Sequence, residues 1–282
     1  LLWTQRGFWN PLFFTGIWMG AILVMYAAGK GYPGPRRHAF LLALSVPLWW
    51  WFEIVNARVG NWEYLGIITY PPWQYLLLAS LAFSTVVPAL DASWGVMGRF
   101  FKPTPARSVS RSRRSYLIQV GAGVVIQAGV FALPDLLFPL VWVAPAVILD
   151  GLVGFLGGRS LVDDLARGEW RLAAQVAAGG LLCGFLWEFW NFWAMPKWTY
   201  HVAYLDLLRL FEMPLAGYAG YIPFAWSVYH LVALVSSRLP GQTRRGSRGE
   251  RVGERGARWG RADASEGLRW RFGIQNGFKV LS

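Results

Sequence analysis

"LLCGFLWEFWNFWAMPKWTY", residues 181–200, places one glutamate inside a run of tryptophan, phenylalanine and leucine. About 20 apolar residues are enough to cross a hydrocarbon core about 30 Å thick as one helix. The earlier stretch "WWWFEIVNARVGNWEY", residues 49–64, has the same character. The two stretches predict a helical membrane protein in which an acidic side chain lies near the end of two separate spans.

The composition of the whole chain supports this prediction. Of its 282 residues, 55% are hydrophobic and 15% are charged, whereas a typical soluble domain has about 25% charged residues. Seven apolar blocks are long enough to satisfy their backbones in lipid as helices. They cover about residues 8–29, 38–57, 71–90, 116–134, 137–157, 173–193 and 214–236. We therefore expect an all-α polytopic membrane helix bundle with about seven transmembrane helices.

Positive charge lies mainly on one side of these spans. With the N-terminus outside, the inner loops before the tail carry twelve Lys and Arg residues and the outer segments carry four. Cytoplasmic loops of membrane proteins carry an excess of Lys and Arg. We therefore expect the N-terminus outside and the C-terminus inside. The four outer residues are Arg6, Arg58, Lys197 and Arg209.

The chain changes character at about residue 240, where Gly, Arg and Ser dominate. A segment with so few apolar residues cannot bury enough surface to offset the conformational entropy that it would lose on folding. We expect a transmembrane domain of residues 1–239 and a basic disordered tail of residues 240–282. Eleven of the 27 Lys and Arg residues lie after residue 237. Because positive charge beside membrane spans usually sets their orientation, we expect no nucleic-acid partner. The tail is either solvated or held to anionic lipid headgroups.

The two opening stretches share a pattern of polar and aromatic residues. Glu, Asn, Trp and Tyr follow one another at nearly equal spacing in both, and a proline opens the apolar block after each tyrosine. Two such matches predict an internal duplication, with halves of about residues 8–90 and 137–236. Four crossings separate the related spans, so the repeats are parallel and both motifs reach the outer face. The matching residues are Glu53, Asn56, Trp62 and Tyr64, then Glu188, Asn191, Trp198 and Tyr200.

Both glutamates are candidate catalytic residues. Apolar surroundings and the negative end of a helix dipole disfavour ionisation, so we expect uncharged acids. Costly intramembrane polar groups are functional candidates by default. The candidate substrate-binding residues are Asn56, Trp62, Tyr64, Trp187, Asn191, Trp198 and Tyr200. In the alternative interpretation, the same clusters are structural staples that fasten outer loops to the bundle.

Other polar residues point to packing. Asp150 lies nearer the cytoplasmic half of its span, and we expect it to pair with a polar group such as Gln119 or Gln127. The alternative role for Asp150 is a proton relay. After the second motif, Leu205, Leu208 and Phe211 have helical spacing, which predicts a short helix in the membrane interface. No two of the three histidines have ligand spacing on one helix, so we expect no metal. No cofactor motif is present, and no protein partner is indicated.

Several motifs resemble a family of uncharacterised bacterial multipass membrane proteins. They are "FPLVW" (138–142), "LDG" (149–151), "LVDDLARGEWR" (161–171), the stretch around Glu188, and "LFEMPLAGYAGYIPFA" (210–225). The resemblance covers about residues 116–236 and implies a bacterial cytoplasmic membrane protein, but the family has no established activity.

The chain also resembles carotenoid-modifying membrane proteins, namely the lycopene cyclases and carotenoid hydratases. Trp187 and Glu188 match the acidic residue that follows Trp in the cyclase repeats. The paired glutamates expected after Pro214 are replaced by "LAGY". The leading hypothesis is therefore a membrane protein that binds or modifies a long apolar lipid, including isoprenoids, at an outer-leaflet site. The alternative is a non-catalytic membrane subunit or scaffold. A transporter is a third possibility, because parallel repeats also occur in transporters.

Overall fold

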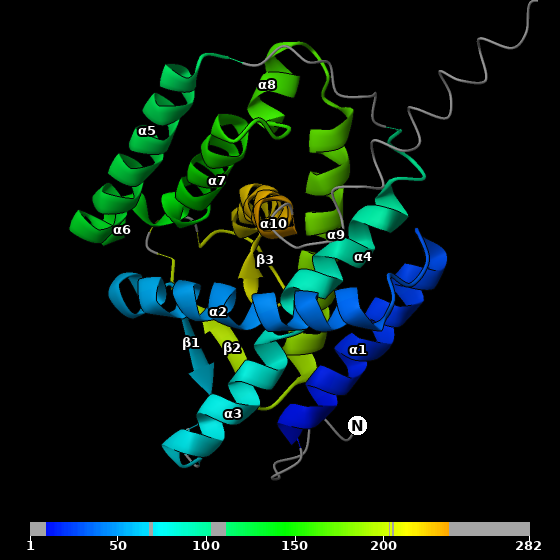
Figure 1. The fold of residues 1–282 in the computed structure, drawn as a ribbon. Coiled ribbons are helices and arrows are strands. Elements are labelled where there is room, and N and C mark those ends of the chain that lie inside the picture. Colours follow the sequence, from blue (N-terminus) through cyan, green and yellow to red (C-terminus); the bar gives the residue numbers. More distant parts are fainter. Residues whose placement is uncertain (1–9, 68–69, 103–110, 203, 205, 237–282) are drawn as a thin grey trace, which may run out of the picture. The chain divides into compact units, whose positions relative to one another are not determined.

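The structure is a computed structural model that describes residues 10–67, 70–102, 111–202, 204 and 206–236. The predicted tail and the first residues of the first predicted span lie outside these described residues. The described chain is mostly helical, as predicted (Figure 1). The α-helices are α1 Asn10–Ala28, α2 Pro35–Val59, α3 Pro72–Phe83, α4 Val86–Met97, α5 Arg113–Ala132, α6 Pro134–Leu137, α7 Val143–Phe155, α8 Leu161–Ala166, α9 Arg171–Trp193 and α10 Tyr221–Ser236.

Five helical segments of the described chain are long and apolar enough to cross a membrane. They are Pro35–Val59, Pro72–Met97, Arg113–Ala132, Arg171–Trp193 and Leu215–Ser236. A sixth candidate is the pair Pro134–Val141 and Val143–Phe155, which is bent by 45°. Leu12–Ala28 is a shorter apolar helix. The membrane-protein class predicted from the sequence is thus supported, because these segments match the predicted blocks.

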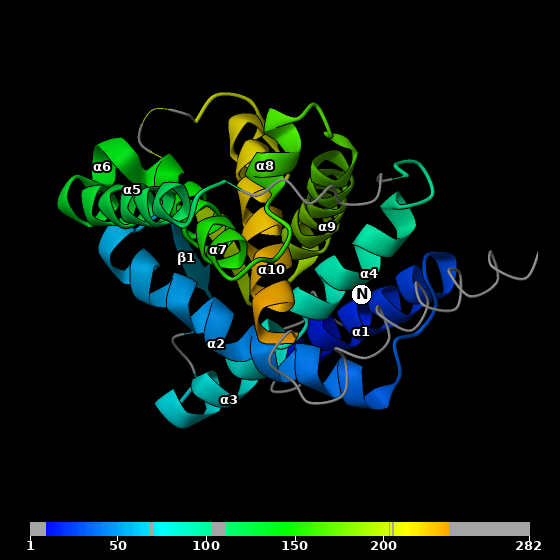
Figure 2. The same cartoon turned by 45° about the horizontal axis from the view of Figure 1, so that its top comes forward.

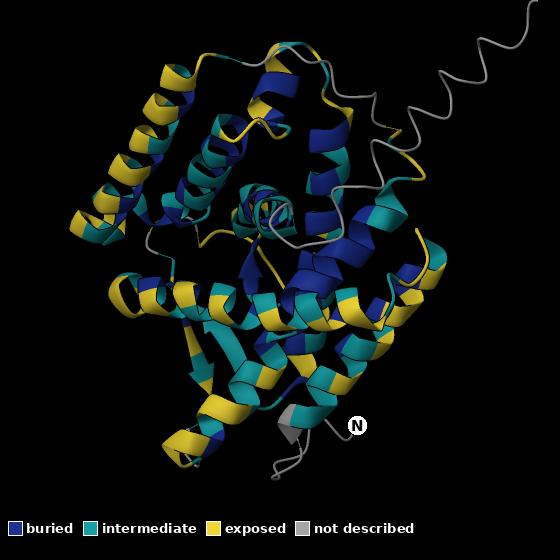
Figure 3. Cartoon of the chain, in the orientation of Figure 1, coloured by how far each residue is buried: buried dark blue, intermediate teal, exposed yellow. Residues whose placement is uncertain are grey.

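The centre of the molecule is formed by α4 and α10. All of the residues from Val86 to Trp94 on α4 are buried, and α10 buries Phe224, Ala225 and Val228. Figure 3 shows α4 almost continuously buried. In contrast, α5 exposes large apolar side chains such as Ile118 and Val125. A contiguous exposed apolar face of this kind suits contact with lipid.

Two short antiparallel strand pairs interrupt the helices. β1 (Trp62–Leu65) pairs with β2 (Lys197–Tyr200), and β3 (Arg209–Leu210) pairs with β4 (Met213–Pro214). The sequence predicted a short interfacial helix with Leu205, Leu208 and Phe211 on one face. Leu205 lies outside the described residues, and the prediction is wrong for Leu208 and Phe211. Both residues have positive φ, of 36° and 60°, which a helix does not allow. The described residues there form the β3–β4 hairpin instead.

α2 and α9 bring the two motif copies together. They run in clearly different directions, and each leads into one strand of the β1–β2 pair (Figures 1 and 2). α2 ends at Val59. The next residue, Gly60, has a left-handed backbone with φ of 70°, and its N–H donates to the Asn56 carbonyl. The strands therefore begin within a few residues of the helices that carry Glu53 and Glu188.

Candidate functional site

The two Trp–x–Tyr segments pair with each other across the molecule. In the β1–β2 register Trp62 lies opposite Tyr200, and Tyr64 lies opposite Trp198. Side chains at alternate positions of a strand share a face, so these four aromatic rings lie on one side of the sheet. The sequence placed both segments in outer loops but did not indicate that they pair.

Glu53 binds the strand that follows its own helix. Its Oε1 accepts hydrogen bonds from Tyr64 OH at 2.6 Å, Trp49 Nε1 at 2.9 Å and Trp62 Nε1 at 3.2 Å. Trp49 lies one helical turn before Glu53 on α2, so α2 supplies one donor and β1 supplies two. The carboxyl of Glu53 is half-buried.

Glu188 has an equivalent set of contacts in the second copy. Its Oε1 accepts hydrogen bonds from Tyr200 OH at 2.7 Å, Tyr221 OH at 2.9 Å and Trp198 Nε1 at 3.3 Å. Glu188 is 0% exposed. Its Oε2 has no hydrogen-bond partner within the described part of the chain, so Glu188 is the more deeply buried of the two acids.

The third donor differs between the copies for a steric reason. Gly184 occupies the position four residues before Glu188 that Trp49 occupies before Glu53. A Cβ on Gly184 would lie 2.3 Å from the ring of Tyr221. The glycine therefore makes room for the Tyr221 ring, and the Tyr221 hydroxyl takes the place that the Trp49 indole has in the first copy.

Asn56 and Asn191 hold the strands through the backbone. Asn56 Nδ2 donates to Trp62 O at 2.7 Å, and Trp62 N donates to Asn56 Oδ1 at 3.2 Å. Asn191 makes the same two bonds with Trp198, at 2.8 and 2.9 Å. Each asparagine thus fixes the backbone of the tryptophan in its own motif, through both the N–H and the oxygen of its side-chain amide.

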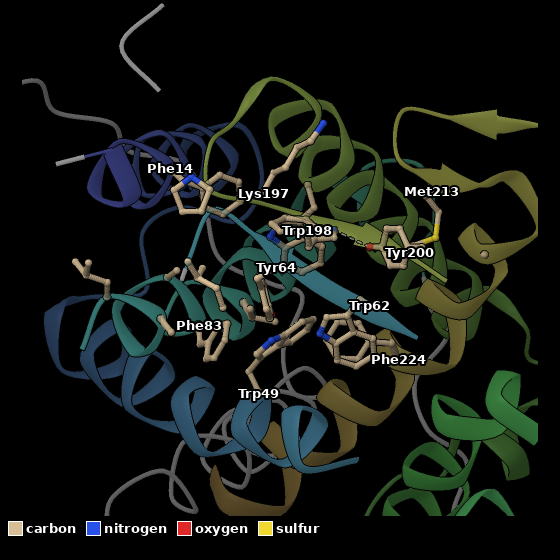
Figure 4. Close-up of a pocket in the computed structure, with 18 of the residues that line it drawn as sticks. Phe14, Trp49, Trp62, Tyr64, Phe83, Lys197, Trp198, Tyr200, Met213 and Phe224 are labelled. Carbon is tan, nitrogen blue, oxygen red and sulfur yellow. Dashed lines mark hydrogen bonds between the residues drawn. The ribbon is translucent and has the colours of Figure 1, made fainter. Parts of the chain in front are cut away.

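An apolar, partly open cavity of about 170 Å³ lies against the aromatic face of the β1–β2 pair. We call it the aromatic cavity (Figure 4). Trp62, Tyr64, Trp198 and Tyr200 project into it from the strands, and α2, α3 and α10 complete its wall with residues such as Trp49, Phe83 and Phe224. Lys197 also lines it, but its Nζ is bound by Glu212 Oε1 at 2.5 Å.

The tryptophan of each motif also contacts an aromatic residue from outside the two motifs. Phe14 of α1 meets the Trp198 ring edge-on, with centroids 5.6 Å apart. Trp142, which precedes α7, stacks on Trp62 with centroids 5.9 Å apart. Phe14 and Trp142 both line the aromatic cavity, which is therefore built from both halves of the chain.

The tyrosine hydroxyls of the two strands act as donors. Burial, reinforced by the adjacent Glu53 carboxyl, raises the pKa of Tyr64 well above its usual value. Burial and the adjacent Glu188 carboxyl do the same for the pKa of Tyr200. Both phenols therefore keep their protons at neutral pH, and the glutamate oxygens are the acceptors.

The predicted site residues fall into two groups. Trp62, Tyr64, Trp187, Trp198 and Tyr200 line the aromatic cavity. Glu53, Glu188, Asn56 and Asn191 lie behind this layer, where they bind its side chains and backbone. The sequence analysis missed Trp49, Trp142 and Tyr221. Trp49 could have been found from its helical spacing to Glu53, whereas Trp142 and Tyr221 come from distant segments without a shared motif.

The remaining polar predictions lie away from this cavity. The expected pair of Asp150 with Gln119 is confirmed, since Gln119 Nε2 donates to Asp150 Oδ2 at 2.8 Å. His230 Nε2 also lies 3.0 Å from Asp150 Oδ1. His201 contacts Glu63 at 2.8 Å. Among the described residues, no group of three His, Cys, Asp or Glu side chains could hold a metal ion.

Comparison with known proteins gave no match to a family model, to a curated protein or to a solved structure.

Proposed function

We propose that this protein is an integral membrane protein that binds the apolar end of a long lipid in the aromatic cavity. The observation that carries this proposal is the cavity itself, which is lined by aromatic side chains from both halves of the chain. Ligand sites are concave and mostly apolar, with a few polar groups at fixed positions. Here the fixed polar groups are the hydroxyls of Tyr64, Tyr200 and Tyr221, which the two glutamates orient.

The size of the cavity limits what part of a ligand fits. An apolar protein cavity of about 150 Å³ holds one benzene molecule, and this cavity measures about 170 Å³. A ring or a short branched terminus fits inside, while the rest of a long molecule extends through the partly open side. Flat aromatic walls favour an unsaturated end group, because π systems pack well offset or edge-on. An isoprenoid meets both requirements, and the resemblance to carotenoid-modifying proteins points to the same class.

The proposed topology has seven spans. They are the five long helical segments, the bent pair that includes α7, and the shorter apolar helix Leu12–Ala28. With the N-terminus outside and the C-terminus inside, the β1–β2 pair lies at the outer face of a bacterial cytoplasmic membrane. The excess of Lys and Arg in the inner loops supports this orientation.

The proposed internal duplication relates α1, α2, β1 and α3–α4 to α7, α9, β2 and α10. Contacts within the two sets match, because α1 packs on α4 as α7 packs on α10. Contacts between the sets also match, as Phe14 meets Trp198 and Trp142 meets Trp62. The paired Glu and Asn hydrogen bonds give the strongest support, since each bond to Trp62 has a counterpart to Trp198.

A second candidate function is a non-catalytic membrane subunit or scaffold. The observation that favours it is the internal use of the polar groups. Among the described residues, the side chains of both asparagines bind backbone atoms and both glutamates bind neighbouring side chains. The two carboxyl groups also lie behind the cavity wall. A proton from either glutamate would have to reach a ligand by way of a tyrosine hydroxyl. In this alternative the clusters are staples and the cavity holds no specific ligand.

Organic extraction of the purified protein, followed by mass spectrometry, tests the lead proposal. An apolar molecule enriched over the surrounding membrane is expected, and bulk phospholipid alone would contradict the proposal. Glu53→Gln and Glu188→Gln then separate the roles of the acids, because they keep shape and hydrogen bonding but remove the acid. If the folded variants retain the ligand but fail to make a lipid product, the acids act in catalysis. Loss of folding alone would favour the staple.

A further inference from the structure

A second cavity lies toward the opposite ends of the same helices. It measures about 620 Å³, and we call it the basic cavity. On α9, the aromatic cavity is lined by Trp187 and the basic cavity by Leu172 and Val176. At 1.5 Å rise per residue, Trp187 and Leu172 are about 22 Å apart along the helix. α2 also reaches both cavities, because it supplies Trp49 to the aromatic cavity and Arg37 to the basic cavity.

Asp91 organises the charges of the basic cavity. It is 2% exposed, and a buried carboxylate must be paired. Lys30 Nζ lies 2.8 Å from its Oδ2, Arg37 Nη2 lies 3.0 Å from its Oδ1, and Tyr26 OH donates to Oδ2 at 3.0 Å. Lys30 and Arg37 remain 41% and 28% exposed. Each cation therefore has further N–H donors available to a ligand.

Close helix contact positions Lys30. A Cβ on Gly95 of α4 would lie 2.9 Å from Lys30 Cγ, and a Cβ on Gly29 would lie 2.6 Å from the Gly95 carbonyl carbon. Glycine at both positions lets the segment after α1 lie directly against α4. The Lys30 ammonium can then reach the buried Asp91.

The basic cavity carries more positive than negative charge. Arg99 also lines it, and no ion pair or hydrogen bond of its side chain occurs among the described residues. Lys30, Arg37 and Arg99 thus face the single carboxylate of Asp91, which leaves two positive charges uncompensated there. An anion is the ligand that this balance favours.

Neutral polar atoms of the same lining are also unsatisfied. Within the described chain, Trp94 Nε1, Ser236 Oγ and Gln175 Oε1 are buried without a hydrogen-bond partner. Trp94 is only 7% exposed. Buried polar groups are normally paired. A ligand that enters between these side chains can supply partners for the indole N–H, the amide oxygen and the hydroxyl, which both donates and accepts. The amide acceptor requires a ligand that also has a hydrogen-bond donor, and the excess positive charge of the lining favours a neutral hydroxyl over an ammonium group.

The rest of the lining is apolar and includes Leu172, Val176, Val232 and Ala233. We propose that the basic cavity binds an anionic phospholipid whose phosphodiester headgroup carries a hydroxyl, as in phosphatidylglycerol. Lys30, Arg37 and Arg99 hold the phosphate, Gln175 accepts from the headgroup hydroxyl, and the apolar wall takes the start of an acyl chain. Basic pockets between membrane helices recognise anionic headgroups in this way. The proposal requires a membrane protein but does not depend on what fills the aromatic cavity.

Native mass spectrometry of the full chain in uncharged detergent tests this inference. Phosphatidylglycerol is expected to bind one per chain at concentrations at which phosphatidylcholine does not. Arg99→Gln should weaken this binding about fivefold, as expected for the loss of one basic contact. Arg36→Gln is the matched control, because it removes one exposed charge that does not line the cavity. Trp94→Phe should weaken binding as well, since it removes only the indole donor.

Three results would overturn the inference. They are equal binding of phosphatidylcholine, equal loss in the Arg36→Gln and Arg99→Gln variants, or displacement of the lipid by millimolar inorganic phosphate. The last result would mean that the cavity takes a free anion. The apolar molecule extracted from the protein should be unchanged in Arg99→Gln, so failure here is distinguishable from failure of the aromatic cavity as a ligand site.

Discussion

At the residue scale, the difference between Glu53 and Glu188 arises from the position one helical turn earlier. Trp49 fills that position in the first copy and donates to Glu53 from the same helix. Gly184 leaves it open in the second copy, and α10 brings in Tyr221. The Glu188 hydrogen bonds therefore join α9, β2 and α10, whereas the Glu53 hydrogen bonds within the described chain join α2 and β1.

Gly184→Ala should lower the stability of the protein. The added Cβ would lie 2.3 Å from the Tyr221 ring, so the ring must move and the bond from Tyr221 OH to Glu188 must lengthen or break. Overpacking of this kind costs about 1–3 kcal/mol. Thermal unfolding of the purified variant is expected to occur at a lower temperature than in the wild type.

Gly121→Ala is the matched control for this variant. Gly121 lies on α5, and a Cβ there would have no atom within 4 Å. Alanine is about 1 kcal/mol better than glycine inside a helix, so this change should leave stability unchanged or raise it. A Gly184→Ala variant as stable as Gly121→Ala would refute the steric account of the Tyr221 contact.

At the scale of elements, the β1–β2 pair depends on the helices around it. An isolated two-stranded hairpin is marginal in water, and here each strand has only four residues. Asn56 and Asn191 fix the two tryptophans through the backbone. The β1–β2 pair therefore depends for its stability on the ends of α2 and α9, to which the two asparagines bind it.

A disulfide across this strand pair tests its register. Glu63 lies opposite Thr199, and directly opposed residues are close enough for a disulfide. In a Cys183→Ser background, Glu63→Cys with Thr199→Cys should form a crosslink under mild oxidation, detected by mass spectrometry of the digested protein. Leu65→Cys with Thr199→Cys is the control pair, and it is two residues out of register, because Leu65 lies opposite Lys197. Crosslinking of the second pair in preference to the first would contradict the structure.

Local sequence information predicted the helices but not this strand pair. Long apolar runs such as the one before Glu188 identify a helix without reference to any other segment. The segments Trp62–Leu65 and Lys197–Tyr200 are short and distant in sequence, so their pairing is decided only when the helices pack. The short helix predicted at Leu208 failed because helical spacing of three side chains does not test the backbone, which has positive φ there.

At the scale of the whole molecule, the aromatic cavity and the basic cavity lie toward opposite ends of shared helices. The sequence indicated which aromatic residues would gather, because the motif is repeated. It did not indicate the cavity, since Phe14, Trp142 and Phe224 come from three helical regions without a common pattern. The sequence also did not predict the Asp91 cluster, because Lys30 and Arg37 were interpreted only as charged residues of an inner loop.

The proposed orientation predicts which positions an impermeant reagent reaches in intact cells. In a Cys183→Ser background, Thr199→Cys should react with an impermeant maleimide from outside, because it follows α9 at the outer face. Arg171→Cys, at the other end of α9, should react only after the membrane is permeabilised. The reverse result would place the N-terminus inside.

The central claim is that the aromatic cavity holds an apolar molecule, and a cavity-filling variant tests it most directly. Ala82 lines the cavity, and a benzene-sized group fits a space of this size, so Ala82→Phe should fill it. The measurement is the amount of apolar organic molecule extracted per chain from wild type, Ala82→Phe and the control Ala128→Phe on the exposed face of α5. We expect about one molecule per chain, as for a single site, in wild type and control, and a large loss in Ala82→Phe. Equal amounts in all three folded proteins would contradict the claim.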